Sequence, residues 1–370
     1  MHFSYYYEGA RPERASRPEA GLSFFHKEAA LPSDLKLVSP EEGGLYYVGR
    51  FPDKVGPSPL FAWQGSELLA RFSGRRLGLR FAAPTIGPVF FNVIVDGENR
   101  MLELDKEGPL NYLLVPELGE GEHELVLYKR TEAFVGAVSF LGLLIEKDAH
   151  LGPKPEALGL RLEFYGDSIT AGACNDEPGE DQYDDQSAHD NYLSYGSIAS
   201  RELGAEYVSI AVSGTGVCES WNPVLMEAVW DKTGCDPYGR PNCQWDFSGR
   251  NPDIVVLNLG QNDFGFPFSQ GRPFPVDFAQ RYTHFVRGLR DAYPEAPIVC
   301  AIGGMAAWHE SAELKAAWEK AVADLKAADG RIFDYRFIAF SRNHPRVPLH
   351  RILASELVAY IRSSVLPSQE

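Results

Sequence analysis

The chain has 370 residues, and its 51 acidic residues against 35 lysines and arginines give a formal net charge of −16. This acidic balance argues against nucleic acid and anionic membranes as partners, and it disfavours anionic substrates. No apolar run approaches the ~18 residues that a transmembrane helix needs. The first residues show no basic segment followed by an apolar one, so we expect no signal peptide and a cytoplasmic protein, although a secreted mature form is also compatible with the sequence.

The five cysteines form an odd and sparse set, which fits reduced thiols. Cys235 and Cys243 share one loop rich in glycine and proline, and they could pair in an oxidising compartment. No pair of Cys-x-x-Cys motifs occurs, so we do not expect a structural zinc site. The sequence therefore predicts neither a metal nor another cofactor.

The first half of the chain has the pattern of an all-β domain. Residues 1–39 lack a clear period and are expected to form an irregular arm. Residues 40–146 contain short apolar or alternating runs separated by turn signals, and Asp96-Gly97 predicts a tight hairpin. This spacing predicts a jelly roll or sandwich, followed by a linker over residues 147–159. The expected strands span residues 67–72, 76–81, 89–95, 101–104, 112–115, 124–129 and 138–145.

The second half, residues 160–370, alternates strands with helices. Repeated βα units predict a five-stranded parallel sheet with helices on both faces, which is a three-layer α/β domain. Ligands of such sheets bind beyond the carboxyl ends of the strands. The expected strands span residues 160–165, 206–211, 253–259, 297–302 and 331–339, and the expected helices span residues 189–203, 275–292, 312–328 and 348–361.

Candidate catalytic residues lie where these predicted elements meet. Ser168 follows the first strand in a tight turn, Gly214 and Asn262 follow the second and third strands, and His344 precedes the last helix. Acyl transfer needs a nucleophile, a base and donors aimed at the developing oxyanion. We predict that Ser168 is the nucleophile and His344 the general base. The N–H groups of Ser168 and Gly214 and the side-chain amide of Asn262 would form the oxyanion hole.

Three of these assignments have alternatives in the sequence. The turn after the first strand could simply place Asp167 or Ser168 as a helix N-cap, and Asp167 fits support of the turn better than chemistry. Asn262 could be a turn residue. Gly216 competes with Gly214, because either glycine would let a backbone N–H approach the substrate closely.

In their order along the chain, these segments resemble the four sequence blocks of the SGNH, or GDSL-type, hydrolase superfamily: 166–168, Gly214, 260–263 and 344–345. Segments 61–66, 95–97, 121–123 and 129–132 resemble the N-terminal domain of carbohydrate esterase family 2, and segments 245–247 and 258–264 resemble the same family. Those proteins join a jelly roll to an SGNH domain. The resemblance covers most of residues 45–365 and implies an acetylxylan esterase-like activity, the deacetylation of xylan or glucomannan.

The predicted base has no obvious acidic partner. The superfamily usually has an aspartate two or three residues before the histidine, and Arg342 and Ser341 stand at those positions here. The nearest upstream aspartate, Asp334, belongs to the preceding strand. We therefore predict a Ser–His dyad in which a backbone carbonyl fixes the tautomer of His344. His344 could alternatively cap the last helix, and His350 is a rival base.

Two further segments are expected to border the site. The loop 174–190 does not match a calcium-binding pattern, so we expect a solvated loop, with a cation site as the alternative. Trp308 follows the fourth strand and is a candidate for stacking on a sugar ring, although core packing would also suit it. Trp221 and Trp230 are weaker candidates. The acidic residues of the loop are Asp176, Glu177, Glu180, Asp181, Asp184, Asp185 and Asp190.

The leading interpretation is a serine O-acetyl esterase whose partner is an acetylated neutral oligosaccharide or polysaccharide. A lipid esterase or thioesterase of the same superfamily is a second hypothesis, and it would need an apolar acyl groove. A third hypothesis is a carbohydrate-binding protein whose esterase domain has decayed. The missing acid favours this last hypothesis slightly, and the presence of all four predicted site residues argues against it.

Overall fold

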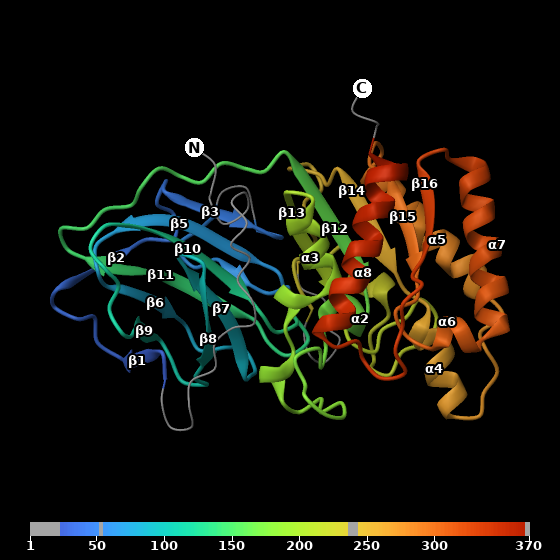
Figure 1. Cartoon of the computed structure of the whole chain (residues 1–370), viewed down its shortest axis with the longest axis horizontal. Coiled ribbons are helices and arrows are strands. Elements are labelled where there is room, and N and C mark those ends of the chain that lie inside the picture. The colour runs from blue at the N-terminus through green and yellow to red at the C-terminus, as the bar shows by residue number, and fades with distance from the viewer. Residues whose placement is uncertain (1–22, 52–54, 236–242, 367–370) are drawn as a thin grey trace. The chain divides into compact units, whose positions relative to one another are not determined.

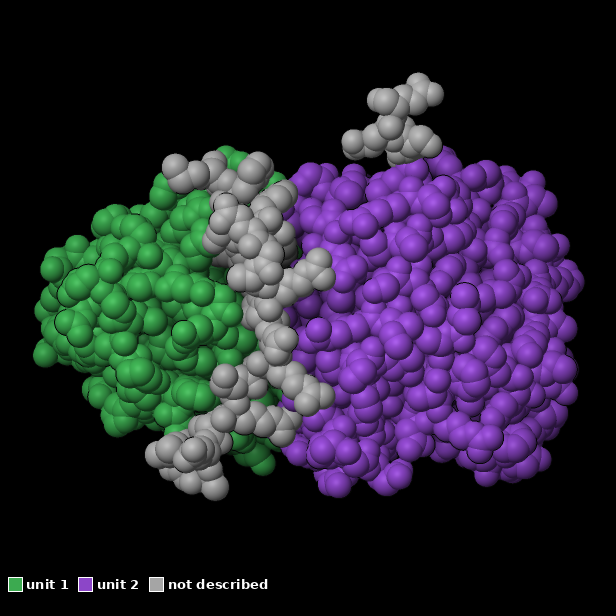
Figure 2. Space-filling view, in the orientation of Figure 1, with its two compact units in different colours: residues 1–157 green, residues 158–370 purple. Residues whose placement is uncertain are grey.

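The computed structural model describes residues 23–51, 55–235 and 243–366. The chain divides into two compact units, residues 1–157 and 158–370 (Figure 2). Cys235 and Cys243, which were considered as a possible pair, are both free thiols. Among the described residues, no helix is both long and apolar enough to cross a membrane.

The first unit is a sandwich of two antiparallel sheets, as the sequence predicted (Figure 1). Its core is built from apolar side chains such as Phe61, Phe81, Phe91 and Phe140, whose rings contact one another. One sheet has the order β1 (Phe25–Glu28), β9 (Leu110–Leu114), β6 (Leu77–Phe81), β11 (Val138–Glu146) and β2 (Leu35–Val38), with β4 (Leu60–Phe61) paired to β11. The other has the order β3 (Leu45–Val48), β5 (Glu67–Ser73), β10 (Glu122–Lys129), β7 (Val89–Val95) and β8 (Glu98–Leu104).

The Asp96-Gly97 turn joins β7 to β8 as a tight hairpin, with Val95 opposite Glu98. Both turn residues have positive φ, 52° and 83°, which is the conformation that a two-residue hairpin turn requires.

Residues 1–39, which were expected to form an irregular arm, include two strands. These strands, β1 and β2, pair with β9 and β11. Each has only four residues, too few for a period to be recognised, and residues 1–22 of that region lie outside the described residues.

The second unit contains the predicted five-stranded parallel sheet, in the order β13 (Ala205–Ala211), β12 (Leu160–Gly166), β14 (Ile254–Asn258), β15 (Ile298–Ile302) and β16 (Ile332–Arg336). Helices cover both faces (Figure 1): α3 (Tyr195–Glu202) packs with α8 (Val347–Tyr360), and α5 (Phe278–Ala292) packs with α7 (Ala312–Ala328). The other helices are α2 (Ser168–Ala171), α4 (Gln261–Ser269) and α6 (Ala307–Glu310), with single turns η1 (Gln186–Ala188), η2 (Asn191–Leu193), η3 (Met226–Ala228) and η4 (Ile361–Val365).

Among the described residues, helix α4 is the longest element of this unit that the sequence did not predict. It begins directly after β14 and contains Gly265 and Pro267, both of which disfavour a helix interior. Asn262 therefore lies in the first turn of a helix and not in an irregular turn. The helix matters for function because its first residues lie at the carboxyl end of the sheet, where ligands of parallel sheets bind.

Candidate active site

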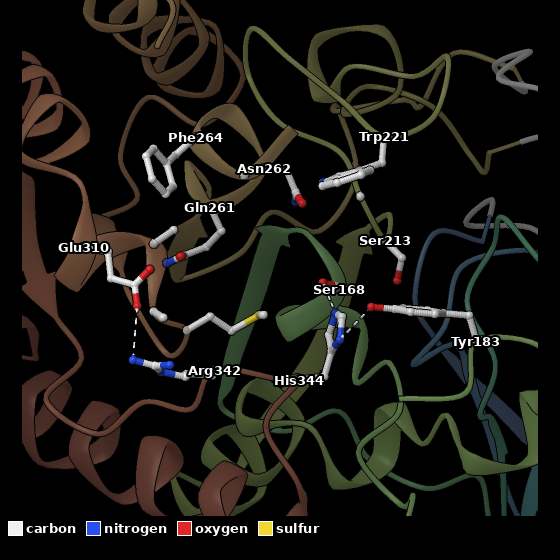
Figure 3. A pocket seen from close by; sticks show the side chains of 15 residues that line it. Ser168, Tyr183, Ser213, Trp221, Gln261, Asn262, Phe264, Glu310, Arg342 and His344 are labelled. Atoms are coloured by element: carbon white, nitrogen blue, oxygen red, sulfur yellow. Dashed lines mark hydrogen bonds and ion pairs between the residues drawn. The ribbon is translucent and has the colours of Figure 1, made fainter. Parts of the chain in front are cut away.

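Ser168 lies where β12 gives way to α2. Asp167 caps this short helix, since its carboxylate accepts a hydrogen bond from the Ile169 N–H at 3.0 Å. Asp167 thus has the supporting role that the sequence favoured. Glycine is required at position 166, because a Cβ there would lie 2.0 Å from Thr170 Oγ1. The sharp turn leaves Ser168 only 6% exposed, yet its side chain lines a pocket (Figure 3).

The imidazole of His344 reaches this serine from the loop between β16 and α8. Its Nε2 lies 2.7 Å from Ser168 Oγ, a distance at which a proton can pass between them. The rival base, His350, is fully buried and its Nδ1 accepts a hydrogen bond from the Tyr195 N–H. Burial lowers the pKa of His350 to about 3. His350 is therefore a neutral core residue.

The predicted dyad is wrong, because a carboxylate does face His344. Asp181 Oδ2 lies 2.8 Å from His344 Nδ1, and the same oxygen accepts the His344 backbone N–H at 3.2 Å. The acid comes from the loop that follows the nucleophile, 163 residues before the histidine. Ser168, His344 and Asp181 form a hydrogen-bonded series of hydroxyl, imidazole and carboxylate, the geometry of a catalytic triad.

Arg346 holds the acid in place. Its Nη1 donates to Asp181 Oδ1 at 2.7 Å and to the Cys174 carbonyl at 2.7 Å, while Nη2 donates to the Gly179 carbonyl at 2.6 Å. The guanidinium thus ties the acidic loop to the segment that carries His344. Burial alone would raise the pKa of Asp181, but the hydrogen bonds from His344 and Arg346 outweigh it and hold this pKa well below its usual range.

Tyr183 covers the outer side of the imidazole. Its hydroxyl lies 3.2 Å from His344 Nδ1, and its ring meets the imidazole edge to face at 5.4 Å between centroids. The side chain is 54% exposed and also lines the pocket. In Figure 3, Tyr183, His344 and Ser168 lie together on one side of this pocket.

Potential ligand atoms of Cys174, Asp181 and His344 lie within 4.8 Å of one another, which is close enough to consider a metal. The chemistry of the three groups does not suit one. Burial raises the pKa of the Cys174 thiol to about 12, so in the absence of a metal this group is a neutral thiol. Asp181 already accepts hydrogen bonds from Arg346 and His344, and a cation would have to compete with these two donors.

The two glycines considered for the oxyanion hole occupy different surroundings. Gly214 lines the pocket beside Ser168 and has φ +79°, a conformation that favours glycine. Gly216 packs against Asp263, so that a Cβ there would lie 2.5 Å from its carboxylate. Asp263 accepts the N–H groups of residues 217, 218 and 219 and so fixes the loop that follows Gly214.

Asn262 also lines the pocket, and its amide is already oriented. Its Nδ2 donates to the Thr215 carbonyl at 2.8 Å and to Asp167 Oδ2 at 3.2 Å. Asp167 and Asp263, the residue that follows Asn262, are both fully buried. Burial raises the pKa of Asp167 to about 7 and that of Asp263 to about 6. The bond to Asp167 is the longer of the two bonds that this amide donates.

The pocket has a volume of about 550 Å³. Trp308 was expected to face a sugar here, but it is only 6% exposed and packs edge to face on Trp318 inside the core. Trp221 instead lines the pocket and is 55% exposed. Phe266 packs against its ring, with 5.2 Å between the ring centroids. Trp230 packs against Phe247 and Phe285. The remaining lining residues are Tyr183, Ser213, Gln261, Phe264, Gly265, Met305, Ala306, Ala307, Glu310 and Arg342.

A serine, a histidine and an aspartate in hydrogen-bonded series at the carboxyl ends of a parallel sheet are the arrangement that serine hydrolases use. The chain belongs to the GDSL-like Lipase/Acylhydrolase family, whose model matches residues 164–351. Residues 47–155 match the Carbohydrate esterase 2 N-terminal family. Both matches confirm the resemblance found in the sequence, and together they show that one chain contains both kinds of domain.

Several known proteins are similar over most of this chain. Cellulase/esterase CelE of Acetivibrio thermocellus is 32% identical over 346 residues, which are 90% of this chain but only 41% of that relative. An acetylxylan esterase / glucomannan deacetylase of Cellvibrio japonicus is 26% identical over 295 residues, 77% of this chain and 78% of the relative. The structure of a family two carbohydrate esterase from Clostridium thermocellum in complex with cellohexaose is 29% identical, with a TM-score of 0.74 over 86% of this chain and 98% of that one.

Proposed function

We propose that the protein is a serine O-acetyl esterase that removes acetyl groups from neutral plant polysaccharides or their fragments, of the xylan or glucomannan type. The observation that carries this proposal is the series from Asp181 through His344 to Ser168, at a pocket with an exposed tryptophan on its wall. The names of the relatives support the substrate class. One is an acetylxylan esterase / glucomannan deacetylase, and the related structure holds cellohexaose.

In this proposal, His344 Nε2 takes the proton of Ser168 as Oγ attacks the acetyl carbonyl. Asp181 accepts the Nδ1–H bond, which keeps Nε2 free to act as a base and stabilises the imidazolium that forms. His344 then gives the proton to the departing sugar oxygen, leaving an acetyl-enzyme. In the second half of the reaction, His344 takes a proton from water, and the resulting hydroxide attacks the acetyl carbonyl. His344 then returns the proton to Ser168 Oγ as acetate leaves.

The oxyanion hole is proposed to consist of the N–H groups of Ser168 and Gly214 and the Asn262 amide. All three residues line the pocket. Replacing Asn262 by alanine should lower kcat on the order of 10²–10³-fold, because an amide donor aimed at the oxyanion acts mainly in the transition state. Steady-state kinetics on an acetylated oligosaccharide measure this effect. A change in KM alone would assign Asn262 to sugar binding instead.

The sugar ring is proposed to lie on the apolar wall of the pocket. Trp221 offers an exposed indole there, and a pyranose that stacks on it would bring an acetyl group toward Ser168. A lipid esterase would instead place a long acyl chain on the same wall, which Phe264 and Met305 extend. The apolar wall is the observation that keeps this second hypothesis open.

Esters of one sugar that carry acetyl, butyryl or octanoyl groups should separate the two hypotheses. We expect hydrolysis to fall sharply beyond propionyl, because sugar and acyl group must share a pocket of about 550 Å³. Initial rates under matched conditions are the measurement. Equal rates on the butyryl and octanoyl esters would favour the lipid esterase.

Acetate release from a panel of acetylated xylo-, manno- and gluco-oligosaccharides tests the proposed function directly. Hydrolysis of 4-nitrophenyl acetate serves as the reference, because it needs the catalytic groups but no sugar site. Activity on the reference together with no acetate release from any saccharide would refute the carbohydrate substrate. The hypothesis of a decayed esterase drew its support from a missing acid, and Asp181 now stands 2.8 Å from His344.

A further inference from the structure

One side chain of the pocket has polar atoms for which no described residue is a partner. Gln261 begins α4 and is only 6% exposed, and neither its Nε2 nor its Oε1 has a hydrogen-bond partner among the described residues. A shielded amide without partners is unfavourable, and such groups in native proteins call for an explanation. The triad does not use it, although Gln261 lines the same pocket as Ser168.

Two charged side chains line the same pocket. Glu310 ends α6, and Arg342 lies in the loop before α8; they are 55% and 87% exposed. Arg342 Nη2 and Glu310 Oε1 are 4.0 Å apart, which is too far for a direct hydrogen bond. In Figure 3, both lie on the side of the pocket opposite His344, and the Gln261 amide is directed to that side.

We propose that Gln261, Glu310 and Arg342 form a polar corner that binds hydroxyl groups of the sugar whose ester is cleaved. This inference rests on the proposed function and names its substrate contacts. A sugar hydroxyl both donates and accepts hydrogen bonds. Glu310 can only accept, Arg342 can only donate, and the Gln261 amide can do both. The last side-chain torsion of glutamine, χ3, takes a broad range of angles. The side-chain amide of Gln261 can therefore turn toward a ligand while its backbone stays in the helix.

The charges of the polar corner determine which sugars it accepts. Glu310 and Arg342 carry opposite charges, so the corner as a whole is neutral and suits a neutral sugar with neighbouring hydroxyls. A uronic acid would gain attraction from Arg342 but meet repulsion from Glu310. Replacing Glu310 by glutamine would leave Arg342 as an unopposed cation, and it should shift preference toward substrates that carry a carboxylate.

The test compares an acetylated oligosaccharide with 4-nitrophenyl acetate in the Gln261→Met, Glu310→Gln and Arg342→Met variants. We expect the ratio of kcat/KM on the sugar to kcat/KM on the reference to fall about tenfold in each, mainly through KM. Gln261→Met and Arg342→Met each lose a substrate hydrogen bond, and Glu310→Gln replaces a charged acceptor by a weaker neutral one. In Glu310→Gln, the rate on an acetylated glucuronoxylan fragment relative to the neutral fragment should rise.

Gln270→Met is the matched control, since Gln270 is the C-cap of the same helix and is exposed, and among the described residues its side chain bonds only to the nearby Arg272. Its substrate ratio should equal that of the wild type. Unchanged ratios in the three corner variants, or equal losses on both substrates, would overturn the polar corner while leaving the proposed function intact. A wild-type protein that hydrolyses 4-nitrophenyl acetate but no acetylated saccharide would overturn both.

Discussion

Replacing Ser168 by alanine should lower kcat for acetate release by roughly 10³-fold or more while the fold stays intact. The hydroxyl is the only nucleophile proposed here, and its Oγ makes the 2.7 Å contact with His344 Nε2. His344→Ala should be nearly as damaging, because nucleophile and base act as a unit. The double variant should then be little worse than either single variant. Steady-state kinetics and circular dichroism measure activity and folding together.

Ser269→Ala is a suitable control for this prediction. Ser269 is an exposed serine at the end of α4, and the Phe266 carbonyl is the one partner of its hydroxyl among the described residues. Near wild-type activity in Ser168→Ala would reject the whole site assignment. Losses that multiply in the double variant would show that serine and histidine act independently, which the short contact between them argues against.

Much of the fold could be predicted because its signals are local. Four strands of the parallel sheet are almost fully buried, and β16 lies within an apolar-rich stretch. Three of the four predicted helices differ from α5, α7 and α8 by no more than three residues at either end. The Asp96-Gly97 hairpin follows from the φ values that these two residues tolerate. Short strands such as β1 are different, because their place in a sheet is decided by pairing with β9, far along the chain.

In the candidate site too, residues with a local sequence signal could be predicted, and a residue placed by long-range folding could not. Ser168, His344, Gly214 and Asn262 lie in short motifs at the ends of predicted elements, and all four line one pocket. Asp181 has no such motif. It is one of several acids in its loop, and only the folded chain brings it to His344.

The nearest signal for Asp181 in the sequence was an unusual composition. An acidic loop follows the nucleophile, and an arginine, Arg346, stands two residues after His344. In the structure, Arg346 donates a 2.7 Å hydrogen bond to Asp181, the acid of this loop that contacts His344. Trp308 failed as a sugar contact for a related reason, since its environment depends on α7, whose Trp318 packs against it.

Asp181→Asn is expected to lower kcat by about 10²–10⁴-fold with little change in KM. The aspartate has two oxygens and uses both: Oδ1 accepts from Arg346 and Oδ2 accepts from His344. Asparagine has one oxygen. The permanently charged guanidinium should hold it, because hydrogen bonds to charged groups are the stronger ones. The amide nitrogen would then face His344 Nδ1 as a donor.

This reversal acts on the tautomer of the imidazole. With a donor opposite Nδ1, the ring proton moves to Nε2, the nitrogen that faces Ser168, and His344 can no longer accept the serine proton. The negative charge that would stabilise the imidazolium is lost as well. Kinetics of Asp181→Asn should be compared with Asp184→Asn, an exposed acid of the same loop whose replacement should leave kcat unchanged. A loss below tenfold in folded Asp181→Asn would mean that a dyad suffices, as the sequence alone had suggested.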